Sequence, residues 1–186
     1  MKILITGASG LYGNKLAQIT STKGYDVFSS YNQDKPTFGS PIQFDISDKK
    51  RVEQVFQQYR PDTVVHAASL TKVDTCETNK ELAWKTNVKG TKNIVQESKK
   101  NHSFLIYIST DYVFDGEKGY YTETDKPDPI NYYGQTKLKA EQQIQTLTNY
   151  CIARPSVIYG STPAANKTNF APVSYTHLTL PTILLV

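Results

Sequence analysis

Two short segments near the middle of the chain carry residue types that could together reduce a carbonyl group. Ser109 and Thr110 follow an apolar run, and Tyr133 and Lys137 come later, four residues apart. A phenol can give a proton to an alkoxide, an ammonium group can favour the ionised phenol, and a hydroxyl can hold the carbonyl oxygen. However, a Tyr-x-x-x-Lys spacing arises about once by chance in a chain this rich in Tyr and Lys. The surrounding elements must therefore decide whether the spacing has a function.

Bulk composition indicates an ordinary globular protein. The chain has 186 residues, enough for one sizeable core, and 38% of them are hydrophobic and 20% charged. The net charge of +4 comes from scattered Lys residues with no aromatic-interleaved basic stripe, which argues against nucleic-acid binding. The apolar stretch at the N-terminus is short and runs into glycines, which argues against a signal peptide or a membrane anchor. Cys76 and Cys151 stand alone, which favours a cytoplasmic protein without a metal site.

Strand-like and helix-like patterns alternate along the chain. Val52, Val55, Phe56 and Tyr59 form one amphipathic helical stripe, which ends before Pro61. Strands are expected near 3–5, 27–28, 42–44, 63–65, 104–108 and 150–152, and helices over 12–23, 52–59, 81–100 and 133–147. This alternation predicts an α/β protein with a Rossmann-like, doubly wound parallel sheet.

A glycine-rich turn follows the first expected strand and opens the first helix. Gly7 would permit the tight turn, Gly10 would let the backbone approach a pyrophosphate, and Gly13 would let helix and strand pack closely. The helix N-terminus would offer its free N–H groups to the phosphates. We therefore expect NAD or NADP, with a plain strand-to-helix turn as the alternative interpretation.

The end of the second strand bears on the choice between the two dinucleotides. Ser29, Ser30, Tyr31 and Asn32 stand where an acid would hold the ribose 2′-hydroxyl, and the next acid, Asp34, lies beside a lysine. Small polar residues near a cation tolerate a 2′-phosphate, so the pattern favours NADP and leaves NAD open. That lysine, Lys35, completes the second Tyr-x-x-x-Lys copy with Tyr31, which falls on the adenosine side and away from the chemistry.

The other Tyr-x-x-x-Lys pair, Tyr133 and Lys137, is better placed for catalysis than Tyr31 and Lys35. Ser109 and Thr110 end the fifth strand, at the edge where open α/β sheets bind ligands, and Tyr133 and Lys137 share one face at the start of the next helix. Lys137 is predicted to lower the pKa of Tyr133 and so improve it as a general acid. The alternative is a core Tyr beside a solvent-exposed Lys.

Two stretches depart from the α/β pattern. Residues 116–131 hold two glycines and two prolines and predict a long surface loop joining the two halves of the reaction centre. After Lys167 no charged residue occurs, and the segment from Pro172 to Thr182 is similar to a translated cloning adapter, a native apolar strand being the alternative. We predict a dinucleotide-binding domain over 1–165, and a truncated or non-native tail over 166–186.

Taken together, the motifs resemble those of the extended short-chain dehydrogenases/reductases, and within them the dTDP-4-dehydrorhamnose reductase group. The most specific match is the string from Ser109 to Gly116, Ser-Thr-Asp-Tyr-Val-Phe-Asp-Gly. The other matches follow in family order: Thr6 to Gly13, Asp45-Ile46, His66 to Ser69, Val73-Asp74 with Glu77, Asn87 to Thr91, Tyr133 with Lys137, and Arg154 to Ser156.

The resemblance implies a catalytic set of Thr110, Tyr133 and Lys137. It implies that Asp45 and Ile46 flank the adenine, and that Asn87 helps a proton relay. His66 would be a strand-end residue without a catalytic role. The expected cofactor-binding residues are Gly7, Ser9, Gly10, Leu11, Gly13, Asn32, Asp45, Ile46, Ala67, Ala68, Asn87, Ser109, Tyr133, Lys137 and Pro155.

The implied activity is reduction of a 4-keto nucleotide sugar by NAD(P)H, with Tyr133 as the proton donor. Two alternatives stay open: a dinucleotide-binding regulatory subunit like the non-catalytic subunit of methionine adenosyltransferase, and a nucleotide-sugar epimerase. Members of the reductase group continue beyond the length of this chain and build most of the sugar pocket there, so this chain alone is expected to be incomplete as an enzyme. A homodimer is expected for the full-length form.

Overall fold

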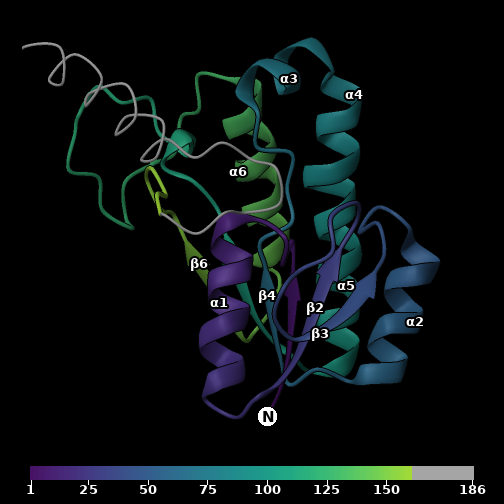
Figure 1. Ribbon diagram of the computed structural model, residues 1–186. Coiled ribbons are helices and arrows are strands. Elements are labelled where there is room, and N and C mark those ends of the chain that lie inside the picture. Colours follow the sequence, from purple (N-terminus) through teal and green to yellow (C-terminus); the bar gives the residue numbers. More distant parts are fainter. Residues whose placement is uncertain (161–186) are drawn as a thin grey trace, which may run out of the picture.

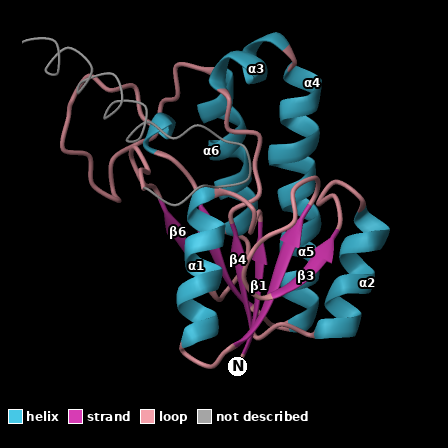
Figure 2. Ribbon diagram, viewed as in Figure 1, coloured by secondary structure: helices cyan, strands magenta, loops and turns pink. Residues whose placement is uncertain are grey.

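The computed structural model describes residues 1–160 and shows a parallel sheet between two layers of helices (Figures 1 and 2). The strands are β1 Lys2–Thr6, β2 Asp26–Tyr31, β3 Ser40–Gln43, β4 Thr63–His66, β5 Phe104–Ile108 and β6 Tyr150–Ala153. They lie in the order β3-β2-β1-β4-β5-β6, and every pair is parallel. The order reverses between β1 and β4, which is the switch point where such sheets bind ligands. The predicted Rossmann-like fold is confirmed.

The helices divide between the two faces of the sheet. They are α1 Leu11–Thr22, α2 Lys49–Tyr59, α3 Val73–Thr78, α4 Lys80–Ala83, the π-helix η1 Trp84–Gly90, α5 Thr91–Asn101, the 3₁₀ turn η2 Asp111–Val113 and α6 Tyr132–Ile144. Ala17 of α1 packs with Ile3 and Ile5, whereas α2, α5 and α6 pack over the face that carries Leu4. The strands are apolar on both faces because helices cover both.

The predicted helix over 81–100 forms, but with an interruption. Residues 80–101 are helical throughout, and the central seven adopt the wider π geometry. Such segments often accompany functional sites because they displace a side chain from its regular position. Here the displaced turn carries the buried Asn87.

Several further expectations can be compared directly. The predicted strands and helices all form, while α3 and η2 were not predicted. The loop over 116–131 contains no helix or strand and is held by a Phe114–Tyr121 ring stack and a Lys118–Asp125 ion pair. The predicted tail over 166–186 lies outside the described residues, and the boundary at 165 stays a prediction. Among residues 1–160, no helix is both long enough and apolar enough to cross a membrane.

Candidate active site

The glycine turn is packed so tightly that side chains cannot be added at two of its positions. Gly7 has φ +70°, and a Cβ there would lie 2.8 Å from the Ala68 backbone. A Cβ on Gly13 would lie 2.4 Å from the Gly7 carbonyl oxygen, while the Gly10 N–H donates to that same oxygen at 3.0 Å. The roles predicted for Gly7 and Gly13 thus have a steric basis in the structure.

The N-terminus of α1 differs from those of α2 and α6, two other helices that cover the sheet and begin after a loop. Side chains of Asp48 and Asn131 cap α2 and α6, whereas Gly10, the N-cap of α1, contributes no side-chain hydrogen bond. The first N–H groups of a helix need an acceptor, and a pyrophosphate supplies one. The backbone of Ser9, Gly10 and Leu11 therefore fits the phosphate end of a dinucleotide.

Gly13→Ala tests this packing. The new methyl group would overlap the Gly7 carbonyl, so we expect a loss of about 1–3 kcal/mol in the free energy of unfolding and roughly tenfold weaker NADPH binding. Gly24→Ala is the control, because a Cβ at Gly24 has open space around it and costs only left-handed strain. Urea unfolding and NADPH fluorescence titration measure both effects. Equal weakening of NADPH binding in the two variants would contradict the steric explanation.

The residues expected around the adenine lie at the ends of β2 and β3. Asn32 directly follows β2, and Ile46 is buried where a Cβ on Gly90 would touch it. Asp45 caps a local turn, since its Oδ1 accepts from the Ser47 N–H at 2.8 Å. These positions lie at the carboxyl ends of β2 and β3, and their contacts with a cofactor remain predictions.

The segment after β4 connects the glycine turn to the reaction centre. The N–H groups of Ala67 and Ala68 donate to the backbone and side-chain oxygens of Thr6, each at 3.2 Å. His66 is fully buried, and its two ring nitrogens bond the hydroxyls of Thr6 and Thr91 at 2.7 and 2.9 Å. Burial, and then the charge of Lys137, lower the pKa of His66 to about 3, so the ring is neutral. This arrangement agrees with a structural role for His66.

The predicted catalytic residues gather where β5 ends and α6 begins. Thr110 caps η2, and Tyr133 occupies the first turn of α6 and is only 7% exposed. The approach is close because position 134 is glycine: a Cβ there would lie 2.1 Å from the Tyr112 carbonyl oxygen. The Tyr31–Lys35 copy instead lies at the end of β2.

The expected lowering of the Tyr133 pKa is wrong for this protein without cofactor. Burial raises the pKa of Tyr133 to about 12, and the hydroxyls of Thr110 and Ser69 oppose that rise only in part. Lys137 does not offset it, because its ammonium donates to the Ile108 carbonyl oxygen at 2.7 Å and lies 4.2 Å from the centre of the Tyr107 ring. The phenol therefore stays protonated at neutral pH, which is the form that a proton donor needs.

Lys137 is almost entirely buried, which excludes the alternative of a solvent-exposed lysine. Desolvation lowers the pKa of Lys137 to about 7, and the Glu141 carboxylate one turn along α6 counteracts the shift. The group thus gains or loses its charge near neutral pH, beside the proposed proton donor.

This shift predicts a pH dependence of stability. Between the folded pKa of about 7 and the ordinary value of 10.5, the unfolded chain binds more protons than the folded protein. The free energy of unfolding should therefore rise with pH across that window through Lys137. The change in the free energy of unfolding caused by Lys137→Met should depend on pH. At about pH 6 the variant should gain a few kcal/mol relative to the wild type, compared with the same difference at about pH 10. Urea unfolding of both proteins at the two pH values measures this effect, and Lys139→Met, at an exposed position, is the control. If Lys137→Met changed the free energy of unfolding equally at both pH values, the prediction would be refuted.

A buried network that was not predicted ties α6 to the ends of two strands. Glu141, fully buried, accepts from Ser109 Oγ at 2.5 Å and from Arg154 Nε and Nη2 at 3.0 and 2.7 Å. Because the Ser109 hydroxyl serves this network, a cofactor contact by Ser109 would have to use other atoms. The Pro155 carbonyl oxygen accepts from the Asp111 N–H at 3.2 Å and helps to hold the same corner.

Asn87 joins the segment after β4 to α6 through its side-chain amide. Its Oδ1 accepts from the Leu70 N–H at 2.8 Å, and its Nδ2 donates to the Leu70 carbonyl and to Thr136 Oγ1 at 3.1 and 3.0 Å. The amide therefore clamps the segment after β4 against α6. These bonds describe a positioning residue, and a relay through Asn87 stays a prediction.

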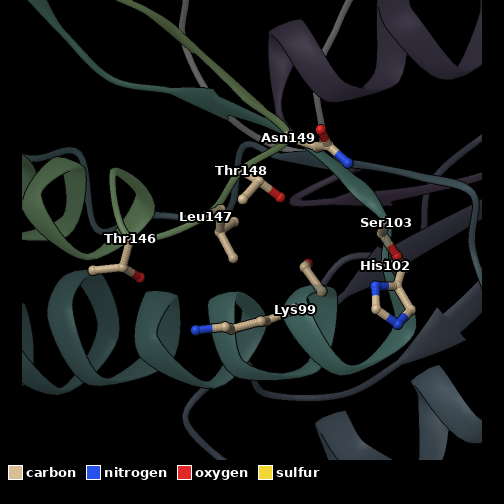
Figure 3. A pocket seen from close by; sticks show the side chains of 8 residues that line it. Lys99, His102, Ser103, Thr146, Leu147, Thr148 and Asn149 are labelled. Atoms are coloured by element: carbon tan, nitrogen blue, oxygen red, sulfur yellow. The ribbon is translucent and has the colours of Figure 1, made fainter.

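Two hollows in the described part of the chain lie away from Tyr133. One of about 240 Å³ lies at the opposite edge of the sheet, where β5 and β6 begin, and is lined by residues that include Lys99, His102 and Asn149 (Figure 3). Another of about 640 Å³ runs along β6 beside Phe114 and Arg154. Neither is lined by the predicted catalytic residues.

The switch-point edge, the glycine turn and the Thr110, Tyr133 and Lys137 cluster define a protein of the short-chain dehydrogenase/reductase class. The chain belongs to the family described as the RmlD substrate binding domain, whose model matches residues 1–178.

Curated relatives share about a third of their residues with this chain. A probable low-salt glycan biosynthesis reductase, Agl14 of Haloferax volcanii, is 37% identical over 164 residues, which is 87% of this chain and 55% of that protein. Methionine adenosyltransferase 2 subunit beta of Danio rerio is 34% identical over 161 residues, 86% of this chain and 48% of that protein. The chain thus spans about half the length of these relatives.

Solved structures agree with this grouping. A hypothetical dTDP-4-dehydrorhamnose reductase from Sulfolobus tokodaii superposes with a TM-score of 0.84 at 39% identity, covering 95% of this chain and 61% of that one. The dTDP-4-dehydrorhamnose reductase of Bacillus anthracis, in complex with NADP, gives 0.81 at 34% identity, covering 94% and 58%.

Proposed function

We propose that this chain is the dinucleotide-binding part of an NAD(P)H-dependent reductase of a 4-keto nucleotide sugar. The observation that carries the proposal is the placement of a buried, protonated Tyr133 between Thr110 and the segment that touches the glycine turn. The names of the relatives, a glycan biosynthesis reductase and dTDP-4-dehydrorhamnose reductases, support the substrate class.

Each residue has a definite part in this reaction. A bound reduced nicotinamide supplies hydride to the carbonyl carbon. Tyr133 holds the proton that the carbonyl oxygen takes up, and the hydroxyl of Thr110, just beyond the end of β5, would hold that oxygen. Lys137 lies one turn along α6 from Tyr133, and with a pKa of about 7 it carries its charge at or below neutral pH. The buried setting keeps water from competing for the proton.

The cofactor preference follows from the end of β2. Ser30 is buried and Asn32 is exposed there, with no carboxylate in the stretch from Ser29 to Asn32. The absence of an acid from this stretch allows a 2′-phosphate, and the NADP complex of the Bacillus anthracis relative supports the same preference. We propose NADP over NAD, in a protein of the cytoplasm.

The test has two arms. Titration of this chain with NADPH and NADH, followed by fluorescence, should show a saturable site with tighter binding of NADPH. The full-length protein should then consume NADPH when dTDP-4-dehydrorhamnose is added. Absence of saturable binding of either dinucleotide would refute the dinucleotide site itself.

A second candidate is a regulatory subunit that binds the dinucleotide without turnover. The 34% identity to methionine adenosyltransferase 2 subunit beta favours it. It predicts NADPH binding with no consumption of NADPH by the full-length protein in the presence of the keto sugar. The same two arms therefore separate the two candidates.

A further inference from the structure

The backbone on either side of Thr110 is held by the short segment that ends β6 and follows it. The N–H of Ser109 donates to the Ala153 carbonyl oxygen at 2.7 Å, and the N–H of Asp111 donates to the Pro155 carbonyl oxygen at 3.2 Å. Both donors lie beyond the last residue of β5, so these bonds extend the grip of the sheet past its own end. The place of Thr110 therefore depends on where that segment lies.

The middle residue of the same segment sends its side chain to α6. Arg154 donates from Nε and Nη2 to the Glu141 carboxylate at 3.0 and 2.7 Å. The same carboxylate accepts from the Ser109 hydroxyl at 2.5 Å. A two-pronged pairing of a guanidinium with a carboxylate fixes direction as well as distance. Glu141 therefore fastens the end of β5 and the end of β6 to one point on α6.

Glu141 and Lys137 lie one turn apart on α6 and hold neighbouring residues at the end of β5. Lys137 Nζ donates to the Ile108 carbonyl oxygen at 2.7 Å, and Glu141 accepts from the hydroxyl of Ser109, the next residue. Side chains four residues apart share one helix face, so both attachments act together. A slide or rotation of α6 along β5 would break both. The attachments thus also set how far the phenol of Tyr133 stands from the end of β5.

Stability alone does not require an ion pair at this place. The Glu141 side chain is fully buried, and that of Arg154 is 20% exposed. Taking two charges out of water is expensive, and a well-packed apolar pair of similar volume is often as stable or more so. What an apolar pair lacks is direction, because it would fill the same space without holding Ser109 and the end of β6 at fixed distances from α6.

We propose that Glu141 and Arg154 are positioning residues whose ion pair sets the place of Thr110 relative to Tyr133. This inference rests on the proposed function, in which the Thr110 hydroxyl holds the carbonyl oxygen and the Tyr133 phenol gives it a proton. Both groups must reach the same oxygen at hydrogen-bond distance. A displacement of about 1 Å in such an arrangement can lower the rate by about 10²-fold. Glu141 and Arg154 act through their neighbours and not on the reacting atoms.

The test replaces the ion pair by two apolar side chains in the full-length protein. Glu141→Met combined with Arg154→Met removes both charges together, so the urea midpoint should stay near that of wild type. The kcat with dTDP-4-dehydrorhamnose and NADPH should nevertheless fall by about 10²-fold. The Kd of NADPH should change much less, because the glycine turn packs on the segment after β4. Gln142→Met, at the next and exposed position of α6, is the control and should behave as wild type.

A second variant keeps the proposal testable if the double variant does not fold. Arg154→Lys retains the positive charge but loses the planar fork that pairs with both carboxylate oxygens. Its kcat should fall, by less than in the double variant, while the Kd of NADPH stays close to that of wild type. A wild-type kcat in Arg154→Lys would overturn the proposal, because positioning depends on the direction of the paired bonds.

The possible outcomes separate this inference from the proposed function. Wild-type turnover together with an unchanged kcat in the folded double variant would overturn the positioning role and leave the proposed function standing. Parallel losses of kcat and NADPH affinity would also overturn it, because the pair would then only support the fold. NADPH binding without any wild-type turnover would refute the reductase function, and the positioning role with it.

Discussion

Tyr133→Phe in the full-length protein is expected to reduce the rate of carbonyl reduction by about 10²- to 10⁴-fold, the usual contribution of a general acid. NADPH affinity should stay close to that of wild type, because phenylalanine keeps the ring that packs against Cys76 and Leu70. Since burial raises the pKa of Tyr133 to about 12, the wild-type phenol is protonated at neutral pH, and the variant lacks the hydroxyl that carries this proton.

Tyr132→Phe is the matched control for this substitution. It removes a phenol hydroxyl from the adjacent position of α6, where the ring lies 5.2 Å from the Lys80 ammonium. Steady-state consumption of NADPH and fluorescence titration of the cofactor should be measured for both variants. Normal turnover by Tyr133→Phe would show that another group gives the proton.

Glu141→Ala is expected to lower the free energy of unfolding by about 3 kcal/mol or more, as when one partner of a buried ion pair is removed. Glu141 is fully buried, whereas the Arg154 side chain is 20% exposed, so the variant leaves a largely buried guanidinium without its carboxylate. The Ser109 hydroxyl loses its acceptor in the same step.

An exposed ion pair provides the comparison for this effect. Glu53 lies 3.9 Å from the Lys100 ammonium, with 41% of its side chain exposed, and Glu53→Ala should change the stability by less than about 1 kcal/mol. Urea unfolding of both variants, with Arg154→Met and the double variant completing a cycle, isolates the coupling between Glu141 and Arg154. Similar losses for Glu53→Ala and Glu141→Ala would contradict the importance of the buried network.

The order of strands and helices could be predicted from the sequence because its physical causes are local. Runs such as Ile3 to Ile5 are apolar since helices cover both faces of the sheet, and the glycine turn shows where the first helix starts. The π geometry around Asn87 could not be predicted, because it depends on contacts with Leu70 and Thr136, at separations of 17 and 49 residues.

Part of the candidate site could likewise be predicted from the sequence, and part could not. Thr110, Tyr133 and Lys137 come into one cluster because strand ends and helix starts meet at one edge of a parallel sheet. Nothing in the sequence pattern marks Glu141, whose partners Ser109 and Arg154 lie at the ends of two strands. The pKa of Tyr133 was predicted in the wrong direction because charge was considered and desolvation was not, and the direction depends on burial that only the packed structure shows.

The Ser109–Glu141–Arg154 network also bears on how the protein is made. Glu141 precedes its cationic partner by 13 residues, and Arg154 follows the last strand of the described sheet. During synthesis, α6 therefore leaves the ribosome before the guanidinium that pairs with its buried carboxylate. Burying the unpaired carboxylate would oppose the docking of α6 on the sheet until β6 and Arg154 have emerged. We therefore expect α6, which carries Tyr133 and Lys137, to pack on the sheet late in folding.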